Sequence, residues 1–146
     1  MRIFLHHQNV LQLTEADTLV LPVDGIGRGL EGNVARKFLK AIDYDSLDEL
    51  YEKPVAYPFN GGCQWAQIED IDETHFEYVC ALGILSHQAG ADHRGFIRSA
   101  LYHMFEAAEG GSVGTKLGCP VLSAGGRLPA IDALYLMVAE AERFVS

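Results

Sequence analysis

The chain has few of the features that mark membrane proteins, secreted proteins or nucleic-acid binders. Its 146 residues include only 11 lysines and arginines against 20 acidic residues, which leaves a formal net charge of -9. General nucleic-acid binders and membrane-surface proteins need a surplus of basic side chains to meet phosphates, so the charge argues against both partners. No apolar run approaches the roughly 20 residues that a membrane helix needs, and the first ten residues contain no long signal-type apolar segment.

Cysteine is also scarce. Cys63, Cys80 and Cys119 are odd in number and widely spaced, which is a poor disulfide framework and no zinc pattern. We therefore expect a reducing compartment and a cytoplasmic protein. The hydrophobic fraction of 49% with 21% charged residues is typical of a folded chain, and the length fits a single domain over residues 1–146.

The histidines do not build an obvious metal site. His87, Asp92 and His93 could ligate a divalent cation, but their spacing matches no zinc motif. A polar surface loop explains them more simply, and we expect neither a metal nor a cofactor. The sequence leaves the oligomeric state open.

Strands and helices alternate along the chain. Apolar runs and helical spacing predict strands at Arg2–Leu5, Thr18–Val23, Val55–Phe59, Cys63–Ile68, Phe76–Leu85 and Leu117–Ser123, and helices at Asn33–Ile42, Leu47–Glu52, Arg94–Ala108 and from about Pro129 onward with Ile131 inward. Asn60-Gly61-Gly62 predicts a hairpin turn between the third and fourth strands. The alternation indicates an α/β fold with a mixed or parallel sheet in three layers.

A glycine-rich segment follows the buried-type strand Thr18–Val23. It runs from Asp24 to Gly32, between a strand and a helix, where helix N–H groups and glycines without Cβ let a phosphate approach the backbone. Gly27-x-Gly29-x-x-Gly32 also matches the dinucleotide fingerprint. However, no acidic residue ends a second strand about 20 positions later, as that fingerprint requires. A glycine-rich connection without a ligand is the structural alternative.

A second glycine loop, Ser123–Arg127, again lies between a strand and a helix. Two such loops at strand ends could clamp a diphosphate from opposite sides. Ser123 could instead be a nucleophile, but the usual elbow has a glycine two residues earlier, where this chain has Val121.

These features together resemble a macro domain, the ADP-ribose-binding module. The likeness is carried by Gln8-Asn9-Val10, the strand ending in Asp24 with its glycine loop, the central strand within His75–Gly83, and Gly118–Arg127 before the last helix. The resemblance implies a three-layer α/β/α fold with a mixed central sheet. It also implies binding of ADP-ribose, a related nucleotide or an ADP-ribosylated protein.

The family pattern implies roles for particular positions. Asn9 stands where the family has an aspartate that accepts from the adenine amine, with Val10 beside the base. Asp24 stands at the asparagine that contacts the distal ribose and serves catalysis in hydrolytic members. The remaining implied ligand contacts are Gly25, Gly27, Gly29, Gly32 and Val34 on one side, and Ser123, Ala124, Gly125, Gly126 and Arg127 on the other.

Leu21-Pro22-Val23-Asp24 contains none of the asparagines of the family motif. Whether the chain is an enzyme is therefore left open; if it is one, we expect an ADP-ribosyl or nucleotide-derivative hydrolase in which Asp24 orients or deprotonates a water. Two alternatives also stay open. One is a degenerate macro-like interaction module without nucleotide binding. The other is a dinucleotide-dependent enzyme that uses the Gly27–Gly32 fingerprint.

Overall fold

A sheet with the strand order β2-β3-β1-β4 organises the chain. The structure is a computed structural model that describes residues 1–26, 32–68 and 70–146. In chain order its elements are η1 (Val10–Gln12), β1 (Thr18–Asp24), α1 (Asn33–Ala41), η2 (Leu47–Leu50), β2 (Cys63–Gln67), β3 (Tyr78–Leu85), α2 (His93–Glu109), β4 (Leu117–Gly118) and α3 (Ala130–Val145). None of the described helices is long and apolar enough to cross a membrane.

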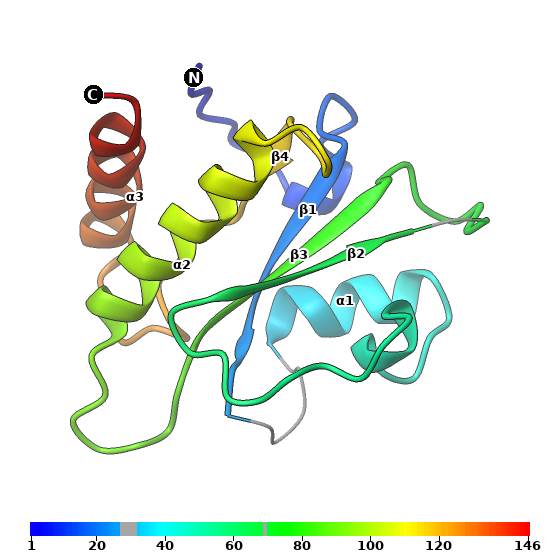
Figure 1. Cartoon of the computed structure of the whole chain (residues 1–146), viewed down its shortest axis with the longest axis horizontal. Helices are drawn as coiled ribbons and strands as arrows, with labels where there is room; N and C mark the ends of the chain where they lie inside the picture. Colours follow the sequence, from blue (N-terminus) through cyan, green and yellow to red (C-terminus); the bar gives the residue numbers. More distant parts are fainter. Residues whose placement is uncertain (27–31, 69) are drawn as a thin grey trace.

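The sheet is mixed, as the resemblance implied. β1 is parallel to both β3 and β4, whereas β2 is antiparallel to β3. β1 and β3 lie in the middle and are almost entirely buried, because both faces of the sheet are covered (Figure 1). Since β1 and β3 run in the same direction, the segments that follow them leave the sheet at the same edge. We call this edge the carboxyl edge.

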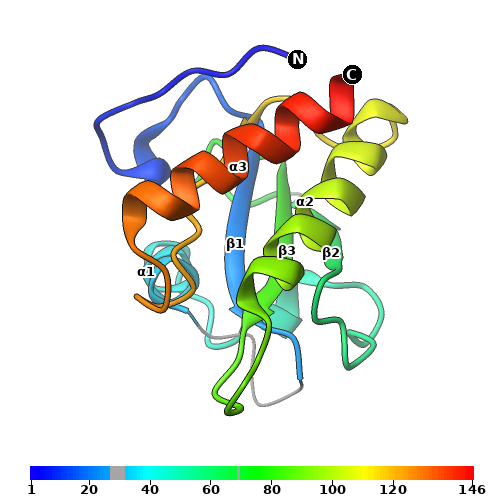
Figure 2. The same cartoon turned by 90° about the vertical axis from the view of Figure 1, so that its left-hand side faces the viewer.

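The helices cover the two faces, which confirms the expected three layers. Alternate residues of β1 divide between the layers: Leu19 and Leu21 join the core around α1, and Val20 joins the core around α2 and α3. Phe38 of α1 fills the first core, and Leu101 of α2 fills the second. Figure 2 shows α1 on one side of the central strands and α2 with α3 on the other.

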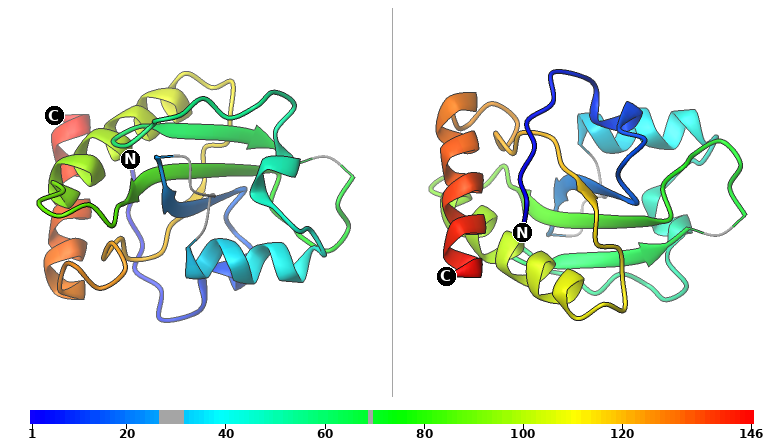
Figure 3. Two further views of the ribbon diagram at one scale, coloured as in Figure 1. Left: turned by 90° about the horizontal axis from the view of Figure 1, so that it is seen from below. Right: turned by 90° about the horizontal axis from the view of Figure 1, so that it is seen from above.

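Two predicted strands are wrong. Arg2–Leu5 forms no strand; Phe4 and Leu5 are 71% and 73% exposed, and the segment runs as a plain trace outside the sheet (Figure 3). The edge strand β4 has only two paired residues, so it offers little ladder for another strand. Val55–Phe59 forms no strand either, since Pro58 has no N–H for a ladder. Instead of closing a hairpin, Asn60 bridges Gly83 in parallel.

Three further expectations are corrected in extent or orientation. The strand predicted at Leu117–Ser123 is limited to Leu117–Gly118, because Pro120 cannot donate to the ladder. The helix predicted at Leu47–Glu52 is a 3-10 turn over Leu47–Leu50, capped by the Ser46 side chain. Ile131, expected to point inward, is 59% exposed at the start of α3.

Asp17 determines where three strands begin. Its carbonyl oxygen accepts from the N–H of Glu77, and its own N–H donates to Lys116, at 2.8 and 2.9 Å. Its carboxylate accepts from the Thr18 hydroxyl at 2.7 Å and from the N–H groups of Thr115 and Lys116 at 3.2 Å each. These bonds join segments almost 100 residues apart, and they set the positions of β1, β3 and β4 relative to one another.

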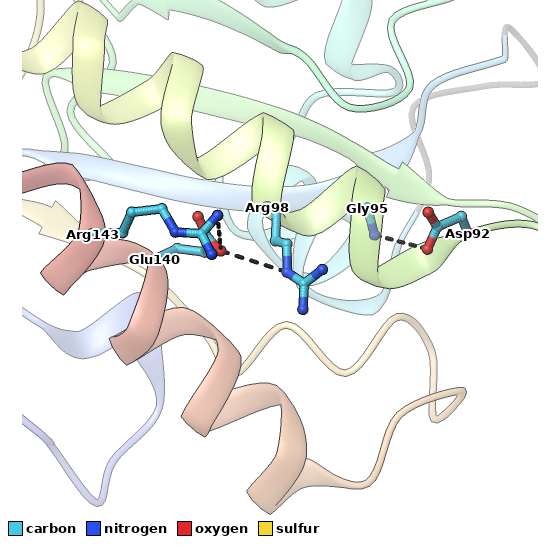
Figure 4. Close-up of polar contacts among 5 residues, drawn as sticks. All are labelled: Asp92, Gly95, Arg98, Glu140 and Arg143. Carbon is cyan, nitrogen blue, oxygen red and sulfur yellow. Dashed lines mark hydrogen bonds and ion pairs between the residues drawn. The ribbon is translucent and has the colours of Figure 1, made fainter.

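A nearly buried carboxylate joins the two helices on the second face. Glu140 of α3 is 8% exposed and lies 3.5 Å from Nε of Arg98 on α2 and 3.6 Å from Nη1 of Arg143 (Figure 4). A buried charge is tolerated when cations meet it, so this cluster fixes α3 against α2. At the other end of α2, Asp92 caps the helix by accepting from the N–H of Gly95 at 2.9 Å.

Candidate functional site

Asp24 turns the chain out of the sheet at the carboxyl edge. Its side chain is 7% exposed, and its Oδ1 accepts from the N–H of Ile26 at 2.9 Å. A side chain that bonds to the backbone two residues later is typical of a tight turn. The next predicted contacts, Gly27 and Gly29, lie outside the described residues.

Gly25 and Gly32 both have no room for a side chain. A Cβ on Gly32 would collide with the carbonyl oxygen of Pro22, and one on Gly25 would collide with the carboxamide oxygen of Asn60. Gly32 is also the N-cap of α1, whose first turn contains no acidic residue. The positive end of this helix faces the carboxyl edge, and the first turn of α1 itself contributes no carboxylate there. Val34, in that first turn, is half-buried against the α1-side core.

The loop Ser123–Arg127 is a compact turn with a left-handed backbone. Ala124, Gly125 and Gly126 have φ values of 54°, 69° and 89°. The Ser123 carbonyl oxygen accepts from the N–H of Gly126 at 3.1 Å and from that of Leu128 at 3.0 Å, which closes the turn. Ala124 is 2% exposed, so a non-glycine residue is held in this unusual conformation by its surroundings.

Two adjacent N–H groups of this turn have no acceptor in the part of the chain that the structure describes. Among the described residues, no acceptor bonds to the N–H of Ala124 or of Gly125. The guanidinium of Arg127 folds back over the same turn and donates to the Ala124 carbonyl oxygen at 3.1 Å. Consecutive N–H groups in such a turn form a concave site for an anion, and Arg127 adds a positive charge beside it.

Arg127 also connects this turn to the loop that follows β3. Its Nη2 lies 3.1 Å from Nδ1 of His87. Since a guanidinium can only donate, Nδ1 of His87 is the acceptor in this bond. Seen from below in Figure 3, the loop after β3, the loop after β4 and the start of α1 surround the carboxyl end of β1. The structure thus brings Asp24, Gly32 and the Ser123–Arg127 turn to one edge.

No protein-family model matches the chain, and no curated protein matches its sequence. Solved structures do match. The macro domain of ganglioside induced differentiation associated protein 2 aligns with a TM-score of 0.70 and 14% identity, over 94% of this chain and 66% of that one. A mutant of the Oceanobacillus iheyensis macrodomain aligns with a TM-score of 0.63 and 14% identity, over 88% of this chain and 70% of that one.

The chain has the fold of a macro domain. It spans just under two thirds of the first of these two neighbours. At 14% identity, these two structures show only that the fold is shared. A ligand and a reaction have to be argued from the residues of this chain.

Within this macro-domain fold, Asn9 and Val10 lie away from the carboxyl edge. Leu11, the residue after them, lines a surface hollow of about 270 Å³ with Ile42 and His75, which stand just after α1 and shortly before β3. Asn9 Oδ1 already accepts from the N–H of Leu11 at 3.0 Å, and Val10 is 8% exposed in the core. Their implied roles at the base stay predictions.

Another surface hollow lies between α2 and α3. It measures about 240 Å³ and is lined by Tyr102, Glu109, Glu140, Arg143 and Phe144. Neither this hollow nor the one beside Leu11 includes a residue of the Ser123–Arg127 turn.

The described residues contain no group of three or more His, Cys, Asp or Glu side chains able to hold a metal ion. The possible cation ligands have structural uses: Asp92 caps α2, and Nε2 of His93 lies 3.1 Å from the Ser86 carbonyl oxygen.

Two residues near Asp24 and Gly25, namely Asn60 and Tyr57, have no role in the site predicted from the sequence. The carboxamide of Asn60 lies against Gly25, and its buried Oδ1 has no hydrogen-bond partner among the described residues. Partial burial, then the carboxylates of Asp48 and Asp24, raise the pKa of Tyr57. Tyr57 therefore lies near Asp24. In the sequence, Asn60 stands out only as the first residue of the predicted hairpin turn. Turn geometry alone explains an asparagine there, so the sequence does not indicate its contact with Gly25.

Proposed function

We propose that the chain binds ADP-ribose, or a related nucleotide diphosphate, at the carboxyl edge between the start of α1 and the Ser123–Arg127 turn. The observation that carries this proposal is the pair of N–H groups at Ala124 and Gly125, which have no acceptor among the described residues and belong to a turn of three left-handed residues. Such groups bind phosphate oxygens without basic side chains, which suits a chain with a net charge of -9. ADP-ribosylated proteins carry the same diphosphate and are the macromolecular form of this ligand.

The charges around the turn support a diphosphate over a neutral ligand. Arg127 lies over Gly125, where an added Cβ would be 3.0 Å from Nη1. The positive end of α1 faces the same edge. Asp24 opposes these contributions, because a carboxylate repels phosphate unless it turns to a hydroxyl group.

Asp24 favours hydrolysis as a second function. Its buried carboxylate bonds to the backbone through Oδ1, and Oδ2 has no donor among the described residues. We propose that Oδ2 accepts a proton from a water as that water attacks the anomeric carbon of the distal ribose. The bond from that carbon to its leaving group, such as a protein side chain, breaks in the same step, and the leaving group takes up a proton.

Calorimetric titration with ADP-ribose tests binding, and AMP and ribose 5-phosphate show which part of the ligand contributes. Arg127→Gln should weaken binding about tenfold and reduce its salt dependence, because one charge-assisted contact is lost. Arg2→Gln removes the same charge from the exposed N-terminal segment and should bind like the wild type. The absence of heat and of a thermal shift at millimolar ADP-ribose would contradict the proposal and leave the interaction-module alternative.

Asp24→Asn separates binding from hydrolysis. The substitution removes the repulsion of the diphosphate and leaves no carboxylate to take the proton. We therefore expect tighter ADP-ribose binding together with loss of ADP-ribose release from an ADP-ribosylated protein, followed by mass spectrometry. Equal release by wild type and variant would refute the catalytic role of Asp24 while leaving the binding proposal intact.

A further inference from the structure

Cys63 and Cys80 lie beside each other on the face of the sheet that α2 covers. Cys63 and Trp65 are two residues apart on β2, so their side chains point to the same face. Trp65 is paired with Cys80 of β3, and Cys63 is paired with Leu82. Cys80 belongs to the core around α2 and α3, and both Cys63 and Trp65 pack against that core.

The hydrogen-bond pattern between β2 and β3 brings the side chains of Trp65 and Cys80 close together. The N–H of Ile68 donates to the Glu77 carbonyl oxygen at 2.8 Å, which marks that pair as hydrogen-bonded. Pair types alternate along an antiparallel ladder, so Trp65 and Cys80 form a non-hydrogen-bonded pair, the type with the closest side chains. Cys63 is the diagonal neighbour of Cys80 on the same face of the sheet, and the long indole of Trp65 lies beside both.

Trp65 brings to the cluster a donor that is unsatisfied within the described part of the chain. Its indole Nε1 is buried and has no hydrogen-bond partner among the described residues. A buried donor without an acceptor costs free energy, and that cost is recovered when an acceptor forms next to it. An oxygen or a negative charge on the Cys63 sulfur would supply that acceptor.

The pKa values of the three thiols differ: that of Cys63 is lowered, and those of Cys80 and Cys119 are raised. The Cys80 thiol lowers the pKa of Cys63, burial opposes it, and the N–H of Trp65 lowers it further. Burial raises the pKa of Cys80 well above its ordinary value and that of Cys119 to about 12. At neutral pH Cys63 is therefore the thiol richest in thiolate, and it is also partly exposed.

We propose that Cys63 is a site of oxidation by hydroperoxides, at which the resulting sulfenic acid is held by the indole N–H of Trp65 and the thiol of Cys80. The Cys63 thiolate attacks one oxygen of hydrogen peroxide. An S–O bond forms, the O–O bond breaks, and hydroxide leaves and is protonated by solvent. The sulfur is oxidised and the peroxide oxygen is reduced. Cys80 stays protonated, so it donates to the product and does not attack it.

The test is labelling of the full chain with a dimedone-type probe during exposure to hydrogen peroxide, followed by peptide mass spectrometry. The probe should modify Cys63 and leave Cys80 and Cys119 unmodified. Equal labelling of all three, or no labelling of Cys63, would overturn the proposal. A disulfide between Cys63 and Cys80 as the main product would also overturn it, because Cys80 would then be a nucleophile.

Two variants test the supporting groups through the rate of Cys63 alkylation by iodoacetamide at neutral pH. Trp65→Phe keeps an aromatic ring but removes the N–H, and Cys80→Ala removes the thiol. Each should slow alkylation about threefold to tenfold, because less of Cys63 is then thiolate. Cys119→Ala is the matched control and should leave the rate unchanged. Thermal melts identify any variant that fails to fold, and unchanged rates in both folded variants would refute the roles of Trp65 and Cys80.

Discussion

Removing the carboxylate of Asp17 should destabilise the chain far more than its position at the start of a strand suggests. The perturbation is Asp17→Ala. It deletes the acceptor of the Thr18 hydroxyl at 2.7 Å and of the N–H groups of Thr115 and Lys116 at 3.2 Å each. Thr18 is fully buried, so its hydroxyl cannot turn to water for a replacement acceptor.

The expected magnitude follows from these three bonds. An orphaned buried hydroxyl costs about 1–3 kcal/mol, and each longer bond to a backbone N–H contributes about 0.5–1 kcal/mol. The sum is about 3 kcal/mol, which for a chain of this size lowers the melting temperature by roughly 6–12 °C. Asp17→Asn keeps one carbonyl oxygen and should lose about half as much stability.

Urea unfolding followed by circular dichroism measures this loss, and Glu15→Ala is the matched control. Glu15 is exposed two residues earlier and accepts no hydrogen bond from the described residues. Its removal should change the free energy of unfolding by less than about 0.5 kcal/mol. If Asp17→Ala and Glu15→Ala unfold at the same urea concentration, the carboxylate does not hold β4 to β1.

Three more outcomes follow from the structure. Gly114→Ala should unfold the chain or lower its melting temperature strongly, because the new Cβ would lie 2.5 Å from Asp17 Oδ1 and closer still to the Thr18 hydroxyl; a melt like that of the wild type would contradict it. Asn60→Ala should keep or raise thermal stability, since it removes a buried acceptor that has no hydrogen-bond partner among the described residues; a clear loss in the melt would refute this. Stability should fall as pH rises from the ordinary Cys119 pKa of 9.0 towards its folded value of about 12, because the unfolded chain loses that proton first. The Cys119→Ala variant should show a smaller fall in alkaline melts, and an equal fall would contradict the assignment.

The central elements of the fold could be predicted from sequence because local chemistry determines them. The strand predicted at Thr18–Val23 corresponds to β1 over Thr18–Asp24, since a run of apolar residues has to be buried on both faces. The helix predicted at Arg94–Ala108 corresponds to α2 over His93–Glu109, since its apolar residues recur at helical spacing. The apolar run of β1 and the helical spacing of α2 each lie within one short segment, so each can be recognised without knowing what that segment contacts.

The errors arose where a distant partner decides the structure. The apolar pattern of Arg2–Leu5 permits a strand. A strand also needs an edge strand with enough residues to pair with, and β4 has only two paired residues. The local sequence of Arg2–Leu5 contains no information about that edge. Asn60-Gly61-Gly62 has the residues of a hairpin turn, yet Asn60 pairs with Gly83 instead. The role of Asp17 likewise depends on Thr115 and Lys116, and nothing in the local sequence around Asp17 indicates these partners.

The same distinction bears on the proposed binding of a nucleotide diphosphate. The proposed anion site is made of backbone N–H groups, so it depends on φ and ψ and hardly on side chains. Recognition of a base depends on particular side chains, and here Asn9 Oδ1 already accepts from the N–H of Leu11. We therefore expect strong dependence on the diphosphate and weak discrimination among bases, measured by titrating the diphosphate-ribose derivatives of different nucleosides. A preference for adenine of a hundredfold or more would contradict this expectation and show that other side chains of the chain recognise the base.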